Sequence, residues 1–217
     1  MSSASPNPLL RRSFLAAIAM LACALAAPAA AGARPKVVTI LGDSITAGYG
    51  LHAADALPAQ LQAALQRIGA PAVVRGAGVS GDTSAGGAAR VDFSVQPDTA
   101  VAVVALGGND MLQGLPPAAM KANLTRIVQR LKARRISVVL CGVQAPASLN
   151  ARYAREFNAV FPAVARAEHV ALYPNLLAGV ELNGALNQRD GIHPNPHGVK
   201  IIAARLAPVI ARALKSA

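Results

Sequence analysis

A serine, a histidine and an aspartate in this chain have the side chains that activate a nucleophile for acyl transfer. Ser44 lies just after an apolar run at residues 37–41, and Asp190 lies three residues before His193. A serine hydroxyl is a weak nucleophile until a base takes its proton, and the base needs a third group to fix its tautomer. Asn109, in a Gly-Gly-Asn-Asp string, adds an N–H donor for the oxyanion that forms on attack. The sequence therefore predicts an acyl-transfer site at these four residues.

These residues lie in four blocks that resemble, in order and spacing, the SGNH hydrolases, also called the GDSL esterase/lipase family. The blocks are Gly42-Asp43-Ser44, Val79-Ser80-Gly81-Asp82-Thr83, Gly107-Gly108-Asn109-Asp110 and Asp190-Gly191-Ile192-His193-Pro194. The resemblance implies Ser44 as nucleophile, His193 as base and Asp190 as the residue that orients the base. It also implies an oxyanion hole formed by the Ser44 N–H, the Gly81 N–H and Asn109.

The resemblance extends from about residue 36 to the C-terminus and is strongest to the periplasmic arylesterase and acyl-CoA thioesterase/lysophospholipase branch. It implies the flavodoxin-like fold of that family, with no cofactor and no metal. One position departs from the pattern: Gly76 stands where relatives usually carry an asparagine. That departure touches no catalytic block, but it leaves open how the loop that carries Gly81 packs.

The first 33 residues have the features of a signal peptide and not of a folded segment. Arg11 and Arg12 precede an apolar stretch at residues 14–27, and Ala31-Gly32-Ala33 fits a small-x-small cleavage site, so the mature chain is expected to start at Arg34. The apolar stretch is too short for a good membrane anchor. The arginine pair fits a twin-arginine signal and an ordinary Sec signal equally well. A third reading is a lipoprotein anchored at Cys23. All three predict export, with the protein periplasmic or secreted.

Strands and helices alternate along the remainder, residues 34–217. Apolar strand-like runs are expected at residues 37–41, 72–75, 99–106, 136–141 and 170–173, and helical patterns at 55–67, from 116–117 onward, around 153–161 and at 199–214. Continuous apolar strands separated by helices predict a parallel sheet covered on both faces, a three-layer α/β/α sandwich in a single domain. Ligands bind beyond the C-terminal ends of such strands. The serine, Gly81 and Asn109 follow three successive strands and should meet there.

Composition excludes some partners and favours others. The chain of 217 residues has a formal net charge of +11, which includes Arg11 and Arg12 of the leader, and 3% aromatic residues. No aromatic residue interleaves with the densest basic run, 126–135, as a nucleic-acid stacking platform would require. The charge instead predicts attraction to anionic lipids and acidic substrates. Cys141, alone once the leader is removed, is expected to be a buried strand residue without a disulfide.

Two other signals compete with the esterase reading. Residues 76–81 match the Gly-x-Gly-x-x-Gly dinucleotide fingerprint, but they follow the second strand, and the third strand ends without the acid that would hold a ribose. A metal-dependent hydrolase is the second alternative, since four aspartates and two histidines lie in the loop blocks. Pro194 and Pro196 break any helix between His193 and His197, which argues against a shared metal-binding face.

The sequence thus predicts an exported serine esterase for carboxylic esters. The candidate substrates are aryl esters and short-to-medium acyl esters, with acyl thioesters and lysophospholipids as further possibilities. Loops 111–116 and 144–152 are expected to form a partly apolar pocket. The alternatives are a carbohydrate O-acetylesterase and, from another class, an inactive lipid- or nucleotide-binding protein. The oligomeric state stays open.

Overall fold

The computed structural model describes Met1, residues 35–146 and residues 148–217. The predicted leader, with Cys23 and the cleavage site before Arg34, lies outside the described residues. Residues 35–217 form one compact unit.

The centre of this unit is a parallel sheet of five strands in the order β2-β1-β3-β4-β5. The strands are β1 (Val37–Gly42), β2 (Val73–Gly78), β3 (Thr99–Ala105), β4 (Ser137–Cys141) and β5 (Ala171–Tyr173). This order is that of flavodoxin-like doubly wound sheets, in which ligands bind where the strand order reverses, between β1 and β3. The predicted parallel sheet and all five of its strands are confirmed.

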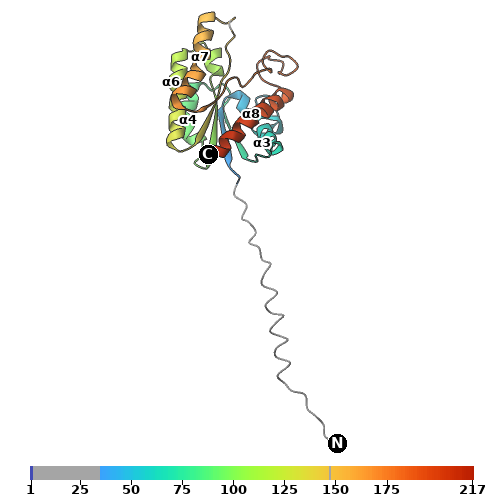
Figure 1. Cartoon of the computed structure of the whole chain (residues 1–217). Coiled ribbons are helices and arrows are strands. Elements are labelled where there is room, and N and C mark those ends of the chain that lie inside the picture. The colour runs from blue at the N-terminus through green and yellow to red at the C-terminus, as the bar shows by residue number, and fades with distance from the viewer. Residues whose placement is uncertain (2–34, 147) are drawn as a thin grey trace. The chain divides into compact units, whose positions relative to one another are not determined.

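Helices cover both faces of the sheet, as Figure 1 shows. On one face, α4 (Ser84–Ser94), α6 (Pro117–Ala133) and α7 (Ala151–Glu168) pack on one apolar core. On the other face, α3 (Leu57–Arg67) and α8 (Pro196–Ser216) pack on a second core. Successive residues of the strands point into opposite cores, because side chains alternate along a strand. The three-layer sandwich predicted from the alternation of strands and helices is therefore confirmed.

One covering helix, α4, was not predicted from the sequence. Its residues 84–90 are mostly serine, alanine and glycine, so the apolar periodicity that marks a helix is weak there. The structure gives a reason for the small residues. A Cβ atom on Gly87 would lie 2.2 Å from the Leu106 side chain, so a larger residue there would require Leu106 to move. The sequence of α4 is set by close packing and not by amphipathicity.

The start of the last helix follows from local chemistry, and the aromatic residues of the helix before it differ in burial. Asn195 caps α8 by accepting hydrogen bonds from the backbone of His197 and Gly198, so this helix begins at Pro196, three residues earlier than its apolar pattern starts. In α7, Phe157 and Phe161 are buried against the sheet as expected. Tyr153, one turn earlier, is only partly buried, and its hydroxyl donates to the Leu115 carbonyl at 3.1 Å.

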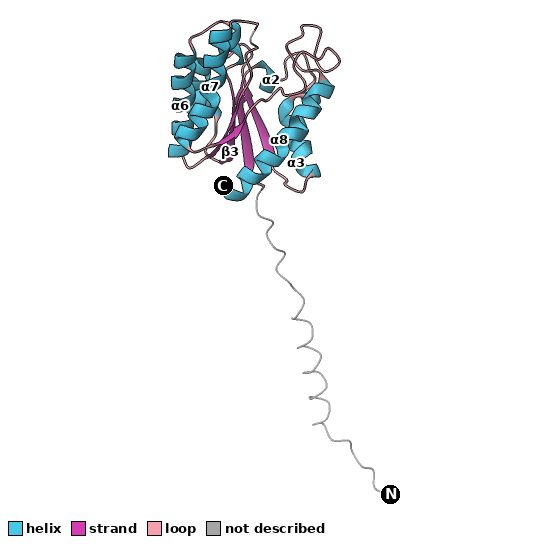
Figure 2. Cartoon of the chain, turned by 45° about the horizontal axis from the view of Figure 1, so that its top comes forward, coloured by secondary structure: helices cyan, strands magenta, loops and turns pink. Residues whose placement is uncertain are grey.

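The register of the sheet aligns the strand ends that carry the chemistry. Gly42, the last residue of β1, pairs with Gly78 at the end of β2 and with Ala105 at the end of β3. Three short elements lie in the connections between strands and covering helices: α2 (Ser44–Ala47), η2 (Ala53–Asp55) and α5 (Gly108–Leu112). Figure 2 shows these connections gathered at one end of the sheet, which we call the carboxyl edge.

Candidate active site

Ser44, His193 and Asp190 form one hydrogen-bonded chain at the carboxyl edge. The distance from His193 Nε2 to Ser44 Oγ is 2.9 Å, and the distance from His193 Nδ1 to Asp190 Oδ2 is 2.6 Å. Ser44 is the first residue of α2, two positions after the end of β1. His193 lies 149 positions further along the chain, and it shares the connection before α8 with Asp190. Both contacts are within the range that proton transfer between a nucleophile and its base requires.

The loop that carries His193 is held by hydrogen bonds of the Asp190 and Gln188 side chains to backbone groups. Asp190 Oδ1 accepts from the backbone N–H groups of Ile192 at 2.9 Å and His193 at 3.0 Å. The Gln188 side chain donates to the carbonyl of Tyr49 at 2.8 Å, which joins this loop to the segment after Ser44. The Tyr49 ring lies 4.6 Å from the imidazole, centre to centre. The imidazole is therefore fixed on two sides before any substrate binds.

The same hydrogen bonds keep the Asp190 side chain ionised. The backbone N–H of His193, the imidazole itself and the N–H of Ile192 together lower the pKa of Asp190 to about 2. A carboxylate with such partners is stabilised in its charged form. A charged Asp190 accepts the Nδ1 proton of His193 and leaves Nε2 free to accept a proton from Ser44.

Gly81 and Asn109 face the same cavity as Ser44. Gly81 has a φ of +82°, in the left-handed region that favours glycine, and nothing lies within 4 Å of where its Cβ would be. Asn109 is in the first turn of α5, and its Nδ2 donates to the Asp82 carbonyl at 2.9 Å. An amide nitrogen carries two protons, so this bond orients the side chain and leaves a second donor. The structure thus brings together all five residues that the sequence predicts for the site.

Sequence reasoning missed Arg90, whose guanidinium joins the segments that carry these groups. From α4, its Nε donates to Asp82 Oδ2 at 2.7 Å and its Nη2 to the Gly42 carbonyl at 2.8 Å. Its Nη1 donates to the Ala77 carbonyl at 2.9 Å. The ends of β1 and β2 and the residue after Gly81 are therefore tied to one side chain. The only signal in the sequence is a single arginine after a run of small residues.

A second buried network fixes α5 to the start of α4. The Asp110 carboxylate accepts from the backbone N–H of Ser84 at 2.7 Å and from the Ser84 hydroxyl at 2.5 Å. Asn123 of α6 donates to the same hydroxyl at 3.1 Å. Asp110 is buried and adjacent to Asn109, so these bonds set where the first turn of α5 points. The aspartates after the strands thus form loop hydrogen bonds.

The structure also bears on the two alternative hypotheses, a metal-dependent hydrolase and a dinucleotide-binding protein. In the residues that the structure describes, no group of three or more His, Cys, Asp or Glu side chains is arranged to hold a metal ion. Two of the three glycines that mimic a dinucleotide fingerprint, Gly76 and Gly78, serve close packing. A Cβ on Gly78 would lie 2.3 Å from the backbone nitrogen of Ala47, and one on Gly76 would lie 2.7 Å from Pro58 Cγ. Gly76 therefore fits because Pro58 occupies the space that a side chain there would need.

A cavity of about 330 Å³ opens beside Ser44. The predicted loop 111–116 contributes Met111 and Leu112 to its wall, whereas the segment after β4 contributes Val143 and Gln144. The expected lining residues further along these loops, such as Leu149, do not reach the cavity. Sequence reasoning missed a third wall from the segment after β5, formed by Asn175, Leu177 and Glu181. Asn175 donates to the Glu181 carboxylate at 2.7 Å, so the mainly apolar cavity has a polar end.

Burial shifts the pKa of two other groups near the sheet, Asp43 and Cys141. Burial raises the pKa of Asp43, which precedes Ser44 and lines the cavity, to about 6. Its Oδ1 accepts from the Ile45 N–H at 3.1 Å and caps α2. Burial also raises the pKa of the Cys141 thiol to about 12. As expected from its place in a strand, Cys141 is a buried free cysteine and not a nucleophile.

Comparisons with known proteins agree with this geometry. Residues 40–201 match the GDSL-like Lipase/Acylhydrolase family. Esterase TesA of Pseudomonas aeruginosa is 40% identical over 163 residues, which cover 75% of this chain and 81% of that protein. Thioesterase 1/protease 1/lysophospholipase L1 of Escherichia coli K12 is 36% identical over 176 residues, 81% of this chain and 83% of that protein. A crystal structure of TesA superposes with a TM-score of 0.77 at 36% identity, covering 82% of this chain and 99% of that one. The chain belongs to the GDSL-like lipase/acylhydrolase family of SGNH hydrolases.

Proposed function

We propose that this protein is a serine hydrolase that cleaves carboxylic esters through an acyl-enzyme. The observation that carries the proposal is the continuous chain from Asp190 through His193 to Ser44, at 2.6 and 2.9 Å, beside an apolar cavity. Family membership and the esterase relatives support the same reaction.

In the proposed mechanism, Ser44 Oγ attacks the acyl carbon while His193 Nε2 accepts the hydroxyl proton. Asp190 stays ionised and stabilises the imidazolium that forms. The charge on the carbonyl oxygen is held by the N–H groups of Ser44 and Gly81 and by the Asn109 amide. His193 then gives its proton to the leaving alcohol or thiol. Water, activated by the same imidazole, hydrolyses the acyl-enzyme and restores the free serine.

The substrates that we propose are aryl esters and short-to-medium acyl esters, with acyl thioesters and lysophospholipids as a wider range. A cavity of about 330 Å³ lies at the small end of ligand pockets and suits a modest acyl chain. The thioesterase and lysophospholipase activities named for the Escherichia coli relative support the wider range. A carbohydrate O-acetylesterase would use the same catalytic groups, but the apolar walls formed by Met111, Leu112 and Leu177 favour an acyl chain over a sugar.

We also propose that the protein is exported, to the periplasm or outside the cell, with residues 1–33 as a Sec or twin-arginine signal. Lipoprotein attachment at Cys23 is the alternative route. Among the helices of residues 35–146 and 148–217, none combines the length and the apolar character needed to cross a bilayer. Neither a nucleic-acid partner nor a metal or cofactor enters the proposal.

A substrate series with a serine-directed label tests the function. Initial rates on p-nitrophenyl esters from acetate to palmitate, with acyl-CoA alongside, give the chain-length and leaving-group preference. An alkyl phosphonate should label the wild-type protein at Ser44 and inactivate it. The Ser44→Ala variant should stay unlabelled and lose on the order of 10³ or more in kcat while keeping its fold. An unlabelled wild-type protein would favour the inactive binding protein, and more than half of the activity left in Ser44→Ala would exclude the serine mechanism.

A further inference from the structure

Exposed large apolar side chains gather at the carboxyl edge, where the cavity opens. Of the nine large apolar side chains exposed between residues 35 and 217 of the described chain, six lie in the connections that leave this edge. We call these six the apolar rim: Tyr49, Val79, Leu112, Leu149, Leu182 and Ile192. Leu182 is 90% exposed, which has no benefit for a side chain that faces only water.

The apolar rim draws on every connection at this edge. Its members come from the segments after β1, β2, β3, β4 and β5, and the last of these segments supplies both Leu182 and Ile192. Tyr49, Leu112 and Ile192 also line the catalytic cavity, whereas the other three lie outside it. Single exposed apolar residues are ordinary on protein surfaces, but a group around the mouth of a cavity indicates an interaction site.

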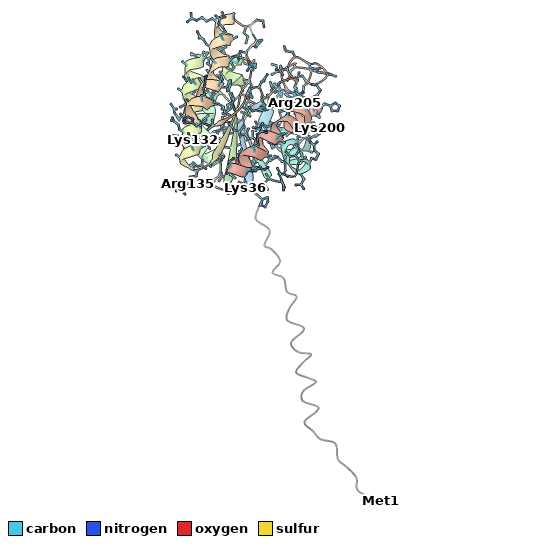
Figure 3. All side chains as sticks on the ribbon, viewed as in Figure 1. Met1, Lys36, Lys132, Arg135, Lys200 and Arg205 are labelled. Carbon is cyan, nitrogen blue, oxygen red and sulfur yellow. The ribbon has the colours of Figure 1, made fainter. Side chains whose placement is uncertain are left out.

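Charge indicates what kind of surface the apolar rim fits. The five connecting segments, 43–56, 79–83, 106–116, 142–150 and 174–195, contain one basic residue, Arg189, although the chain has 21 lysines and arginines. The partly exposed Asp55 and the exposed Glu181 offset that single charge, and Arg152, at the start of α7 beside these segments, is paired with Glu156 at 2.8 Å. Lys36 and Arg135 lie at the opposite end of the sheet, as Figure 3 shows. Connecting segments with so few and nearly balanced charges complement an uncharged or zwitterionic surface and not an anionic one.

We propose that the apolar rim docks the protein on a lipid aggregate with zwitterionic or uncharged headgroups, such as a phosphatidylcholine bilayer or micelle. The proposal rests on the proposed function, because docking there lets an acyl ester enter the cavity without crossing water. A protein partner on the same surface would cover Tyr49, Leu112 and Ile192 and close the route to Ser44. A lipid surface is the occupant that covers the rim and supplies substrate at the same time.

Docking of this kind is driven by apolar burial, so it should be insensitive to salt. This distinguishes it from the attraction to anionic lipids that the net charge alone predicts, which salt screens. Charge-driven binding through the basic end of the sheet would also turn the cavity away from the lipid.

The test is a double variant, Leu149→Ser/Leu182→Ser, because neither side chain lines the cavity. The matched control is Phe93→Ser, which removes an 84% exposed side chain near the far end of α4. Two quantities are measured: hydrolysis of dissolved p-nitrophenyl acetate, and co-flotation of each protein with phosphatidylcholine vesicles at low and high salt. Flotation is done in a Ser44→Ala background so that the lipid stays intact.

The Ser44→Ala protein with no other change and the Phe93→Ser control should bind vesicles to the same extent. Neither should bind less at high salt than at low salt. The double variant should lose on the order of a hundredfold or more in vesicle binding, the amount expected when two leucines no longer insert, with hydrolysis of the dissolved ester unchanged. Equal flotation of the double variant would overturn the proposal. So would binding confined to phosphatidylglycerol vesicles and lost in salt, or a dimer that the double variant abolishes. Absence of ester hydrolysis in every protein would refute the proposed function separately, since flotation does not depend on catalysis.

Discussion

At the scale of single residues, the roles proposed for His193 and Asp190 depend on one imidazole. The carboxylate contacts Nδ1 while Nε2 contacts Ser44, and the carboxylate has no contact with Ser44 itself among the hydrogen bonds of the site. Residues that act as a unit have non-additive effects. Asp190→Asn should therefore lower kcat/KM steeply but no further than His193→Ala, and the double variant should lose little more than His193→Ala alone.

The pH profile of the same variants gives a second readout. Because Asp190 has a pKa of about 2, it is ionised throughout the working range and does not itself contribute to the acidic limb of the wild-type profile. Replacing the carboxylate with a neutral amide removes the charge that favours the imidazolium, so the acidic limb of Asp190→Asn should move to lower pH. The measurement is kcat/KM against pH on one ester. Multiplicative losses in the double variant, with an unmoved limb, would mean that the pair does not work as a triad.

Asn109 should act mainly in the transition state. Its Nδ2 is oriented by the Asp82 carbonyl, and its second proton is free for an oxyanion. Asn109→Ala should lower kcat by roughly 10²–10³ with little change in KM, because the donor meets full charge only after attack. Steady-state kinetics on a single ester separate the two parameters. A raised KM with an unchanged kcat would assign Asn109 to substrate binding instead.

The residues that we propose for the chemistry could be located from the sequence, because each lies in a short block whose members are chain neighbours. Asp190 reaches His193 across three positions, and Ser44 follows a strand whose end is evident from its apolar run. Arg90 could not be predicted in this way. Its partners are the carbonyls of Gly42 and Ala77 and the Asp82 carboxylate. Because every residue has a backbone carbonyl, no residue type in the sequence indicates these contacts.

At the scale of elements, α4 supports the segments that carry two of the proposed oxyanion-hole donors. Its first turn holds α5 through Ser84 and Asp110, and its second turn holds the loop of Gly81 through Arg90 and Asp82. The apolar pattern gave no sign of this helix, since close approach to the sheet requires small residues and excludes large ones. The same close approach is what brings Arg90 within reach of the strand ends.

Arg90→Met should separate this positioning role from stability in general. The side chains of Arg90 and Asp82 are 19% and 11% exposed, so the variant leaves a largely buried carboxylate unpaired and should cost on the order of 3 kcal/mol in unfolding free energy. It should also lower kcat by about tenfold or more, with a smaller effect on KM, because the Gly81 loop loses its fixed position. Arg90→Lys should recover part of both.

The matched control is Arg130→Met on α6, which breaks the exposed pair with Asp92. Surface pairs contribute little, so this variant should change the unfolding free energy by less than about 1 kcal/mol and leave both kinetic parameters unaltered. Denaturant unfolding and initial rates on one ester cover both variants. If Arg90→Met loses stability but keeps its kcat, Arg90 is a structural residue without influence on the oxyanion hole.

At the scale of the whole molecule, the strand order determines where the candidate active site lies. Ser44 follows β1 and Asn109 follows β3, and the chain reverses its direction of winding between these two strands. Loops from both sides leave a gap there that a ligand can fill. The fold class and this edge could be predicted from alternating strands and helices alone. The wall from residues 175–181 could not, because that segment has neither helical nor strand periodicity, and only packing brings it to the cavity.

Ionisation of Asp43 should make the free energy of unfolding of the whole protein depend on pH. Burial gives this carboxyl a pKa of about 6 in the folded protein against 3.8 in the unfolded chain. Between these values the folded protein binds more protons, so this group makes stability fall as pH rises through the window. Asp43→Asn keeps an acceptor for the Ile45 N–H but cannot ionise. Relative to the wild type, the variant should gain up to about 3 kcal/mol of unfolding free energy between about pH 4 and pH 7.

Asp98 provides a control with the opposite sign. It is exposed, and its hydrogen bond to Arg75 lowers its pKa, so its contribution to stability is present above the unfolded value and is lost only as pH falls through the folded pKa. The difference between wild type and Asp98→Asn should therefore be flat above about pH 5, where the Asp43→Asn difference is still growing. Denaturant unfolding of the three proteins at several pH values gives both curves. A constant difference between wild type and Asp43→Asn across the window would mean that the carboxylate beside Ser44 is solvated, and that the cavity floor is wetter than its burial implies.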